Sequence, residues 1–264
     1  MYKIKRQSSF RKSLSVENKK LRTFKEDNIS ITCIENLSNE LFYEIFEYLD
    51  GYDIHKGFCN LNSRFQHLIT CSSISLNIKL CSNATSEVKH CCKTVIIPNI
   101  HRICSLDLED ESLINDFFKH CIINSSFHRL QSIVLSFFGV ENANSFVPLA
   151  PNEQFSTIEY LVINHICTLS ELMSILYHTP QLRHLICDNL VESDSNVQTE
   201  RSMILSNLVY IRINVCDIDF DEFEMFMKIS SQLQILHISQ EYGKAYLDAD
   251  RWKRLIIKHM PHLR

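Results

Sequence analysis

The chain has 264 residues, of which 45% are hydrophobic and 22% charged, and its formal net charge is −4. This composition is ordinary for a folded protein, and the length allows one large domain or two modest ones. It contains no apolar run of roughly eighteen residues and no apolar signal-peptide core near Met1, so we expect a soluble protein of the cytoplasm and/or nucleus with no membrane partner.

The first segment of the chain is strongly basic. Residues 1–25 hold nine Lys or Arg and a single acid, whereas the rest of the chain is net acidic. The segment has several serines and no compact apolar pattern, so we predict that residues 1–30 form a disordered arm. Several roles remain open for this arm: a nuclear address, a phosphorylated segment, a contact with an anionic surface, a mitochondrial presequence, or a solvated tail without a partner.

The next segment, residues 34–69, predicts three short amphipathic helices. Apolar residues of the first recur at three- to four-residue spacing: Leu37, Leu41, Ile45, Phe46 and Leu49. Asp50-Gly51 is expected to break this helix, because glycine suits the turn after a helix. A second helix carries Ile54, Phe58 and Leu61, and a third begins after Asn62, which is a good N-cap. Three such helices are too small to close a core alone.

This pattern resembles the F-box, the motif that docks substrate receptors onto the Skp-type adaptor of cullin–RING ubiquitin ligases. Leu37, Glu40, Leu41 and Phe42 match the family's opening Leu-Pro-x-Glu-Ile-Leu, and Ile45, Phe46, Tyr48 and Leu49 match its Ile-Leu-x-Tyr-Leu. Asp53-Ile54 resembles the family's Asp-Leu, and Leu61 to Phe65 resembles its closing Val-Cys-x-Arg-Trp. Ser38 replaces the usual proline and Phe65 the usual tryptophan, and both changes are of a kind that weakens adaptor affinity. Serine can cap the helix in place of proline. The alternative is a plain helical cap that seals a larger domain.

The resemblance implies that residues 31–72 form the adaptor-binding domain and that the adaptor in turn links the chain to a cullin. The candidate adaptor-binding residues are Leu37, Ser38, Leu41, Ile45, Leu49, Ile54, Phe58 and Leu61. Some of them must instead hold the small domain together, and the sequence does not distinguish the two groups. Burying anchors of a short helix in a groove is a common mode of recognition.

Residues 73–99 are a connector in which Ile74, Leu76 and Ile78 alternate, as in an edge strand of a sheet. Past residue 100 an aliphatic triplet recurs every 24 to 28 residues. The triplets are Ile103-Leu106-Leu108, Leu130-Ile133-Leu135, Ile158-Leu161-Ile163, Leu182-Leu185-Cys187, Leu208-Ile211-Ile213 and Leu233-Leu236-Ile238. Leu263 begins a seventh unit, and helical patterns lie between several of the triplets.

A strand followed by a helix at this period resembles the leucine-rich repeat, in an irregular version without the family's asparagine. The resemblance covers residues 100–264 and implies a solenoid whose inner face is a parallel sheet, because single units cannot bury their apolar faces alone. The predicted fold class is therefore α/β, with an N-terminal three-helix F-box followed by an irregular leucine-rich-repeat solenoid.

Strand alternation places the residues between the triplet aliphatics on the exposed face of this sheet. Tyrosine and arginine often dominate protein interfaces, so this face is the expected contact with an unknown protein substrate. The candidate substrate-binding residues are Tyr160, Asn164, His184, Asp188, Tyr210, Arg212 and His237. A merely solvated face is the alternative.

The sequence offers little for catalysis. The chain has only four glycines, none of them in a phosphate-binding loop, and no hydrolase or kinase motif. The Cys and His residues between Cys81 and Cys104 lack the paired spacing of a zinc site, so we expect no metal and no cofactor. Because the part after residue 25 is net acidic, no nucleic-acid partner is expected.

The resulting hypothesis is a substrate receptor rather than an enzyme. The alternative is a repeat scaffold with a vestigial F-box that binds no ligase. Eleven cysteines in an intracellular chain are expected to be free thiols, with Cys121, Cys167 and Cys187 at core positions.

Overall fold

The computed structural model describes residues 34–81, 85–136, 157–192, 203–240 and 244–264. The predicted basic arm, residues 1–30, lies outside these ranges. Contacts divide the chain into two units, Met1–Leu37 and Ser38–Arg264. The described part of the first unit is a short 3-10 helix, η1 (Ile34–Asn36), closed by a hydrogen bond from the Leu37 N–H to the Ile34 carbonyl.

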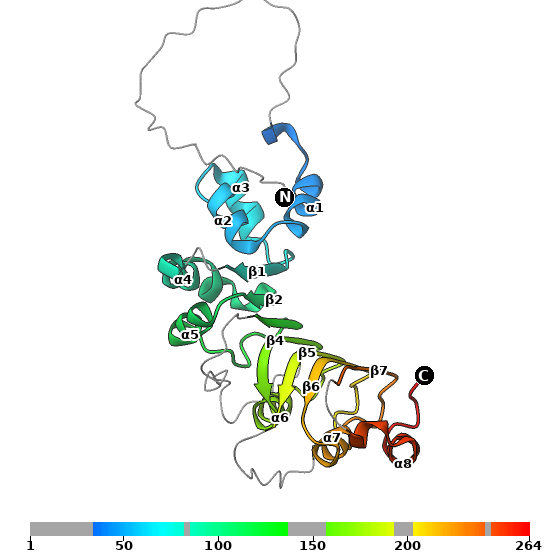
Figure 1. The fold of residues 1–264 in the computed structure, drawn as a ribbon. Helices are drawn as coiled ribbons and strands as arrows, with labels where there is room; N and C mark the ends of the chain where they lie inside the picture. The colour runs from blue at the N-terminus through cyan, green and yellow to red at the C-terminus, as the bar shows by residue number, and fades with distance from the viewer. Residues whose placement is uncertain (1–33, 82–84, 137–156, 193–202, 241–243) are drawn as a thin grey trace, which may run out of the picture. The chain divides into compact units, whose positions relative to one another are not determined.

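The second unit is an α/β fold built on a seven-stranded sheet (Figure 1). The strands are β1 (Leu76–Leu80), β2 (Ile103–Leu108), β3 (Ser132–Ser136), β4 (Tyr160–Thr168), β5 (His184–Val191), β6 (Tyr210–Asp217) and β7 (Ile235–Ile238). Every neighbouring pair is parallel, and the strands follow one another in chain order. Such an order brings each strand against the next in the sequence, which is compatible with a stacked repeat.

Helices precede the sheet and connect its strands. The α-helices of the described residues are α1 (Asn39–Glu47), α2 (Gly51–Phe58), α3 (Ser63–Thr70), α4 (Thr85–Cys91), α5 (Glu111–His120), α6 (Leu169–His178), α7 (Phe220–Met227) and α8 (Ala249–His259). A π-helical turn η3 (Cys92–Ile96) and the 3-10 segment η4 (Ile97–Arg102) join α4 to β2, and η5 (Lys244–Leu247) precedes α8. In Figure 1 the helices α5 to α8 lie along the same side of the sheet.

The aliphatic triplets set the register of the sheet. Their second positions pair across successive strands, from Leu106 of β2 to Leu236 of β7, and their third positions pair in the same way from Leu108 to Ile238. The paired aliphatics of β2 to β6 are buried. A parallel sheet that buries one face requires alternation of this kind, so the sequence period predicted both the strands and their alignment.

A backbone ladder also runs from Cys104 of β2 through the residues that precede β3 to β7, and on to Arg264. The bonds are Gln131 N–H to Cys104 O at 2.8 Å, Glu159 to Gln131 at 2.8 Å, Arg183 to Glu159 at 2.9 Å, Val209 to Arg183 at 3.0 Å, Gln234 to Val209 at 2.9 Å and Arg264 to Gln234 at 2.9 Å. The last bond places Arg264 where Gln234 stands in the unit before. Leu263 therefore occupies the position of Leu233, as expected for the start of a seventh unit.

The strand suggested by the alternation in the connector is present as β1. Leu76, Ile78 and Leu80 are buried, while Asn77 and Lys79 face outward. Pairing of β1 with β2 makes it the first edge of the sheet.

Each of the first three α-helices begins at a side-chain cap. The Ser38 hydroxyl accepts the Leu41 N–H at 3.4 Å, so serine caps this helix as expected for the residue in the proline position. Asp50 accepts the Tyr52 N–H at 2.7 Å, and Asn62 accepts the Phe65 N–H at 3.0 Å. Asp50 also accepts the Lys79 N–H of β1, and burial raises the pKa of this carboxyl. Asp50 thus joins α2 to the edge of the sheet.

The first helix ends before Asp50-Gly51, as expected, but the turn-forming role expected of Gly51 is wrong. Gly51 is the first residue of α2, and the described glycines have no positive φ angle. A Cβ atom at this position would lie 2.7 Å from Ile78 Cδ1 and 3.3 Å from the Asn77 carbonyl oxygen. Close approach to β1, rather than a turn, therefore requires glycine here.

We expect the Gly51→Ala substitution to destabilise the protein by about 1–3 kcal/mol, because the added methyl group overpacks the contact with β1. Gly57→Ala is the matched control within the same helix, since a Cβ atom there meets no atom within 4 Å. That variant should stabilise the protein by about 0.5–1 kcal/mol through helix propensity. Urea unfolding of both variants measures the difference, and equal effects would refute the steric explanation.

Four phenylalanine rings fill the centre of the α1–α3 segment. Phe42 lies 6.0 Å from Phe46, 6.0 Å from Phe58 and 4.9 Å from Phe65 between ring centroids. Phe58 in turn lies 5.0 Å from Phe46 and 5.2 Å from Phe65. Phe42, Phe46 and Phe65 are at most 1% exposed. We call these four residues the phenylalanine cluster.

Candidate docking surfaces

An apolar stripe lies on the outer face of α1 and the turn that follows it. Leu41 is 43% exposed, Ile45 is half-buried and Tyr48 is 89% exposed. The three residues are spaced at four and three positions, so they lie on one helical face. Phe42 and Phe46, each one position further along the helix, occupy the adjacent, buried face. We call Leu41, Ile45 and Tyr48 the α1 stripe.

The structure separates the predicted adaptor-binding residues into exposed and internal groups. Leu61, 59% exposed between α2 and α3, joins Leu41 and Ile45 as available for contact. Ile54 is 2% exposed and Phe58 belongs to the phenylalanine cluster, so these two residues stabilise the fold. They therefore belong to the residues that were expected to hold the small helical domain together, although Phe58 is only half-buried.

The remaining three predicted adaptor-binding residues have other positions. Ser38 is exposed and caps α1, and Leu49 is half-buried. Leu37 is half-buried and belongs to the Met1–Leu37 unit, so we do not group it with the α1 stripe.

Arg64 links α3 to α1. Its Nε donates to Asn39 Oδ1 at 2.8 Å, and its guanidinium carbon lies 5.4 Å from the Phe42 ring centroid. This arrangement fixes the first residue of α1 and covers the edge of the phenylalanine cluster.

The second candidate surface is the exposed face of β4 to β7, where a row of rings crosses four strands. The Tyr160 and His184 rings stack with centroids 4.4 Å apart and planes 1° apart. His184 lies 5.7 Å from Tyr210, and Tyr210 lies 5.8 Å from His237. The register aligns Tyr160, His184 and Tyr210 directly across the sheet. We call these four residues the aromatic row.

The position of His184 between two tyrosines affects its charge. Burial lowers the pKa of His184, and the neighbouring Arg183 lowers it further. The imidazole is therefore biased towards its neutral form, which stacks on tyrosine without the cost of burying a charge.

Polar side chains lie beside the aromatic row on the same face. Arg212 Nε donates to Asn214 Oδ1 at 2.7 Å, and Asn214 Nδ2 donates to Asp188 Oδ1 at 2.8 Å. On the β3 side, Asn164 Nδ2 donates to Ser136 Oγ at 2.9 Å. All seven predicted substrate-binding residues thus lie on one face of four adjacent strands, as the alternation predicted.

The other end of this face is neutralised by its own charges. Lys79 of β1 forms an ion pair with Asp107 of β2 at 3.3 Å and a second with Glu109, which follows β2. These carboxylates raise the pKa of Lys79. Polar contact with a partner is therefore better provided by the β4–β7 end, where rings and a guanidinium are presented together.

Two residues of these surfaces were not among the predicted contact residues. Tyr48 and Asn214 are absent from the predicted contact residues, although Tyr48 is the most exposed member of the α1 stripe and Asn214 connects Arg212 to Asp188. A spacing of seven from Leu41 to Tyr48 is the signal that could have identified Tyr48. Asn214 follows the same alternation as Arg212, but a hydrogen-bond chain across strands leaves no mark in the sequence.

Other features of the described residues bear on chemistry. Their ten cysteines are free, and Cys121, Cys167 and Cys187 are buried, as expected for core thiols. Burial raises the pKa of Cys121 and of Cys187 to about 12, so both remain thiols. Within the described ranges, no cluster of three or more His, Cys, Asp or Glu could hold a metal ion. No helix in that part of the chain is both long and apolar enough to cross a membrane.

Comparison with known proteins adds no assignment to these surfaces. A scan against models of protein families finds none that matches the chain, and a search of curated proteins finds no significant match.

Proposed function

We propose that the chain is a substrate-recognition subunit of a Skp–cullin–F-box ubiquitin ligase. In this proposal α1 to α3 form the F-box and bind the Skp-type adaptor, which recruits the cullin. The sheet and its helices form an irregular leucine-rich-repeat solenoid that binds a protein substrate. The chain supplies binding and proximity, while other subunits supply the catalytic step.

The observation that carries the proposal is the α1 stripe. Leu41 and Tyr48 are exposed on a helix whose other face is filled by the phenylalanine cluster, so the small helical segment needs neither of them for its own core. Exposed apolar residues in a row on a short helix fit insertion into a groove of a partner. The order of polar markers that resembles the F-box lies on the same three helices.

The aromatic row supports the second half of the proposal. Interfaces are enriched in tyrosine and arginine, and Tyr160, Tyr210 and Arg212 are presented on one face. The hydrogen-bond chain from Arg212 to Asp188 holds the polar groups in place before a partner arrives, which reduces the entropy lost on binding.

The test is coexpression with a Skp-type adaptor followed by size-exclusion chromatography. We expect a one-to-one complex that the Ile45→Asp variant weakens tenfold or more. Burial of one such side chain is worth about 2 kcal/mol, and a buried charge costs more. Met225→Asp is the matched control, because Met225 is 52% exposed on α7, outside the α1–α3 segment.

Circular dichroism establishes that both variants are folded. Folded protein that ignores the adaptor would overturn the receptor proposal and leave the repeat scaffold with a vestigial F-box. A double variant, Tyr210→Ala with Arg212→Ala, should still form the adaptor complex but should no longer bind the protein substrates that the unmodified chain binds. Loss of the adaptor complex in that variant would contradict the division into two surfaces.

A further inference from the structure

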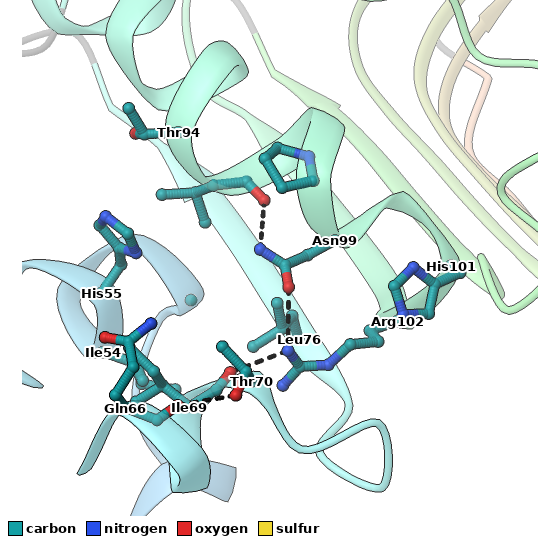
Figure 2. A pocket seen from close by; sticks show the side chains of 13 residues that line it. Ile54, His55, Gln66, Ile69, Thr70, Leu76, Thr94, Asn99, His101 and Arg102 are labelled. Atoms are coloured by element: carbon teal, nitrogen blue, oxygen red, sulfur yellow. Dashed lines mark hydrogen bonds between the residues drawn. The ribbon is translucent and has the colours of Figure 1, made fainter. Parts of the chain in front are cut away.

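A cavity of about 310 Å³ lies between the N-terminal helices and the start of the sheet (Figure 2). Helices α2 and α3 contribute Ile54, His55, Gln66 and Thr70 to its lining, and β1 contributes Leu76. The other side is formed by η3 and η4. This volume falls at the lower end of the range of small-molecule sites.

Arg102 lines this cavity from the end of η4, and its side chain is 1% exposed. Three acceptors hold the guanidinium group. Nε donates to the Ile74 carbonyl at 3.1 Å, and Nη1 donates to the Ile69 carbonyl at 2.8 Å and to Asn99 Oδ1 at 2.9 Å. Figure 2 shows the group directed from η4 towards Thr70. Nη2 is also buried, and it has no hydrogen-bond partner among the described residues.

The guanidinium group is held in a fixed orientation. The Asn99 side chain accepts from Arg102 through its oxygen and donates through Nδ2 to the Val95 carbonyl at 2.7 Å (Figure 2). The asparagine amide is thereby fixed, and it fixes the arginine in turn. A group positioned in this way loses little conformational entropy when it binds a ligand.

The charge of Arg102 has no counter-ion in the described part of the chain. Its acceptors are two backbone carbonyls and an amide, and none of the ion pairs found there includes it. A buried guanidinium is normally paired with a carboxylate or a phosphate, because burial of an uncompensated charge is costly. The free N–H groups of Nη2 therefore indicate the kind of ligand that the cavity would accept.

We propose that this cavity binds a small molecule that carries an oxyanion, either a carboxylate or a phosphate monoester, on an apolar body. The oxyanion accepts from Arg102 Nη2, and the apolar body lies against Ile54, Leu76 and Val95 of the lining. Charge-assisted bonds from a guanidinium are the strongest hydrogen bonds available to such a ligand. The site is independent of the proposed receptor function, since neither the α1 stripe nor the aromatic row takes part.

The ligand would also join two parts of the unit. Gln66 and Thr70 belong to α3, whereas Arg102 ends the segment that leads into β2. A molecule bound between them adds contacts from the helical segment to the sheet, so binding should stabilise the folded chain by linkage.

The test is isothermal titration calorimetry of the full chain with four probes: phenyl phosphate, benzoate, inorganic phosphate and benzyl alcohol. We expect phenyl phosphate or benzoate to bind at least tenfold more tightly than benzyl alcohol, which has the apolar body without the charge. Preference for phenyl phosphate assigns a phosphate monoester, and preference for benzoate assigns a carboxylate. The absence of binding by both at concentrations on the order of 10 mM would overturn the proposal.

Variants assign the binding to Arg102. Arg102→Lys keeps a charge but loses the planar fork, and should weaken the preferred probe tenfold or more. Arg129→Lys is the matched control, because Arg129 is exposed, donates to the Ser72 carbonyl at 3.1 Å and does not line the cavity. The affinity of the Arg129→Lys protein for the preferred probe should stay within about twofold of the affinity of the unmodified protein.

A second variant covers the case in which Arg102→Lys does not fold. Thr94 is half-buried in the lining, and Thr94→Phe should fill the cavity while leaving the three bonds of Arg102 in place. It should abolish probe binding without loss of helix or strand signal in circular dichroism. Unchanged affinity in folded Thr94→Phe protein, or in folded Arg102→Lys protein, would show that the probes bind elsewhere and would refute the site.

Discussion

Replacement of Phe42 by alanine is expected to destabilise the helical segment by about 3–5 kcal/mol. The Phe42 side chain is 0% exposed and contacts the rings of Phe46, Phe58 and Phe65. Its removal leaves a cavity that three rigid rings cannot easily fill, and it also removes the surface on which Arg64 lies. The transfer and cavity terms therefore both act at this position.

Leu41→Ala is the matched control for this prediction. Leu41 is the next residue along the chain and is 43% exposed, so the same kind of truncation should cost less than about 1 kcal/mol. Urea unfolding followed by circular dichroism measures both variants. If Leu41→Ala destabilised the protein as much as Phe42→Ala, the division of α1 into a buried and a docking face would be wrong.

Both substitutions should weaken the adaptor complex, but for different reasons. In the proposed receptor, Leu41→Ala weakens the complex while the protein remains stable, because an anchor is lost. Phe42→Ala weakens it only through loss of the folded helix. Comparison of complex formation with unfolding data for the same variants therefore separates contact residues from core residues.

Acid is expected to destabilise the protein through His165 of β4. Burial lowers the pKa of His165 to about 4, from an ordinary value of 6.5, and a hydrogen bond involving the Leu135 backbone only partly opposes this effect. The unfolded chain binds a proton near pH 6.5 while the folded chain does not. The contribution of this residue to stability is therefore fully present above pH 6.5 and is lost as the pH falls from 6.5 towards 4.

The expected loss between pH 7.5 and pH 4.5 is about 2–3 kcal/mol from this residue. Urea unfolding at a series of pH values measures it, with His165→Phe as the comparison, because phenylalanine is of similar size and cannot be protonated. The variant should retain the weaker pH dependence of the other shifted groups, among them His55, His184 and His259, whose pKa values burial also lowers. An unchanged slope in the variant would show that His165 does not carry the effect.

His165 lies where the pairing of β4 with β5 is irregular. The register shifts between Ile163 and Ile166, so Asn164 and His165 occupy a bulge. A bulge redirects side chains, which explains why a histidine beyond the last aliphatic of its triplet is drawn inward. The period of the sequence contains no sign of this irregularity.

The sequence by itself determined the features that depend on local order. Aliphatic triplets at a period of 24 to 28 residues predicted six strands and their register, because a strand that buries one face must alternate. Helical patterns between the triplets predicted that helices connect the strands, as α5 to α8 do. Ser38 and Asn62 predicted helix starts through their capping chemistry.

Only the tertiary structure decided which residues contact one another across the chain. Ile54 and Leu61 have the same periodic signal, yet one is buried and the other exposed. The sequence misplaced Gly51 because the steric reason for glycine lies in β1, more than twenty residues away. The stacking of Tyr160 on His184 and the burial of Arg102 arise in the same way. Such features come from contacts between segments that folding brings together, and side-chain spacing within one segment carries no information about them.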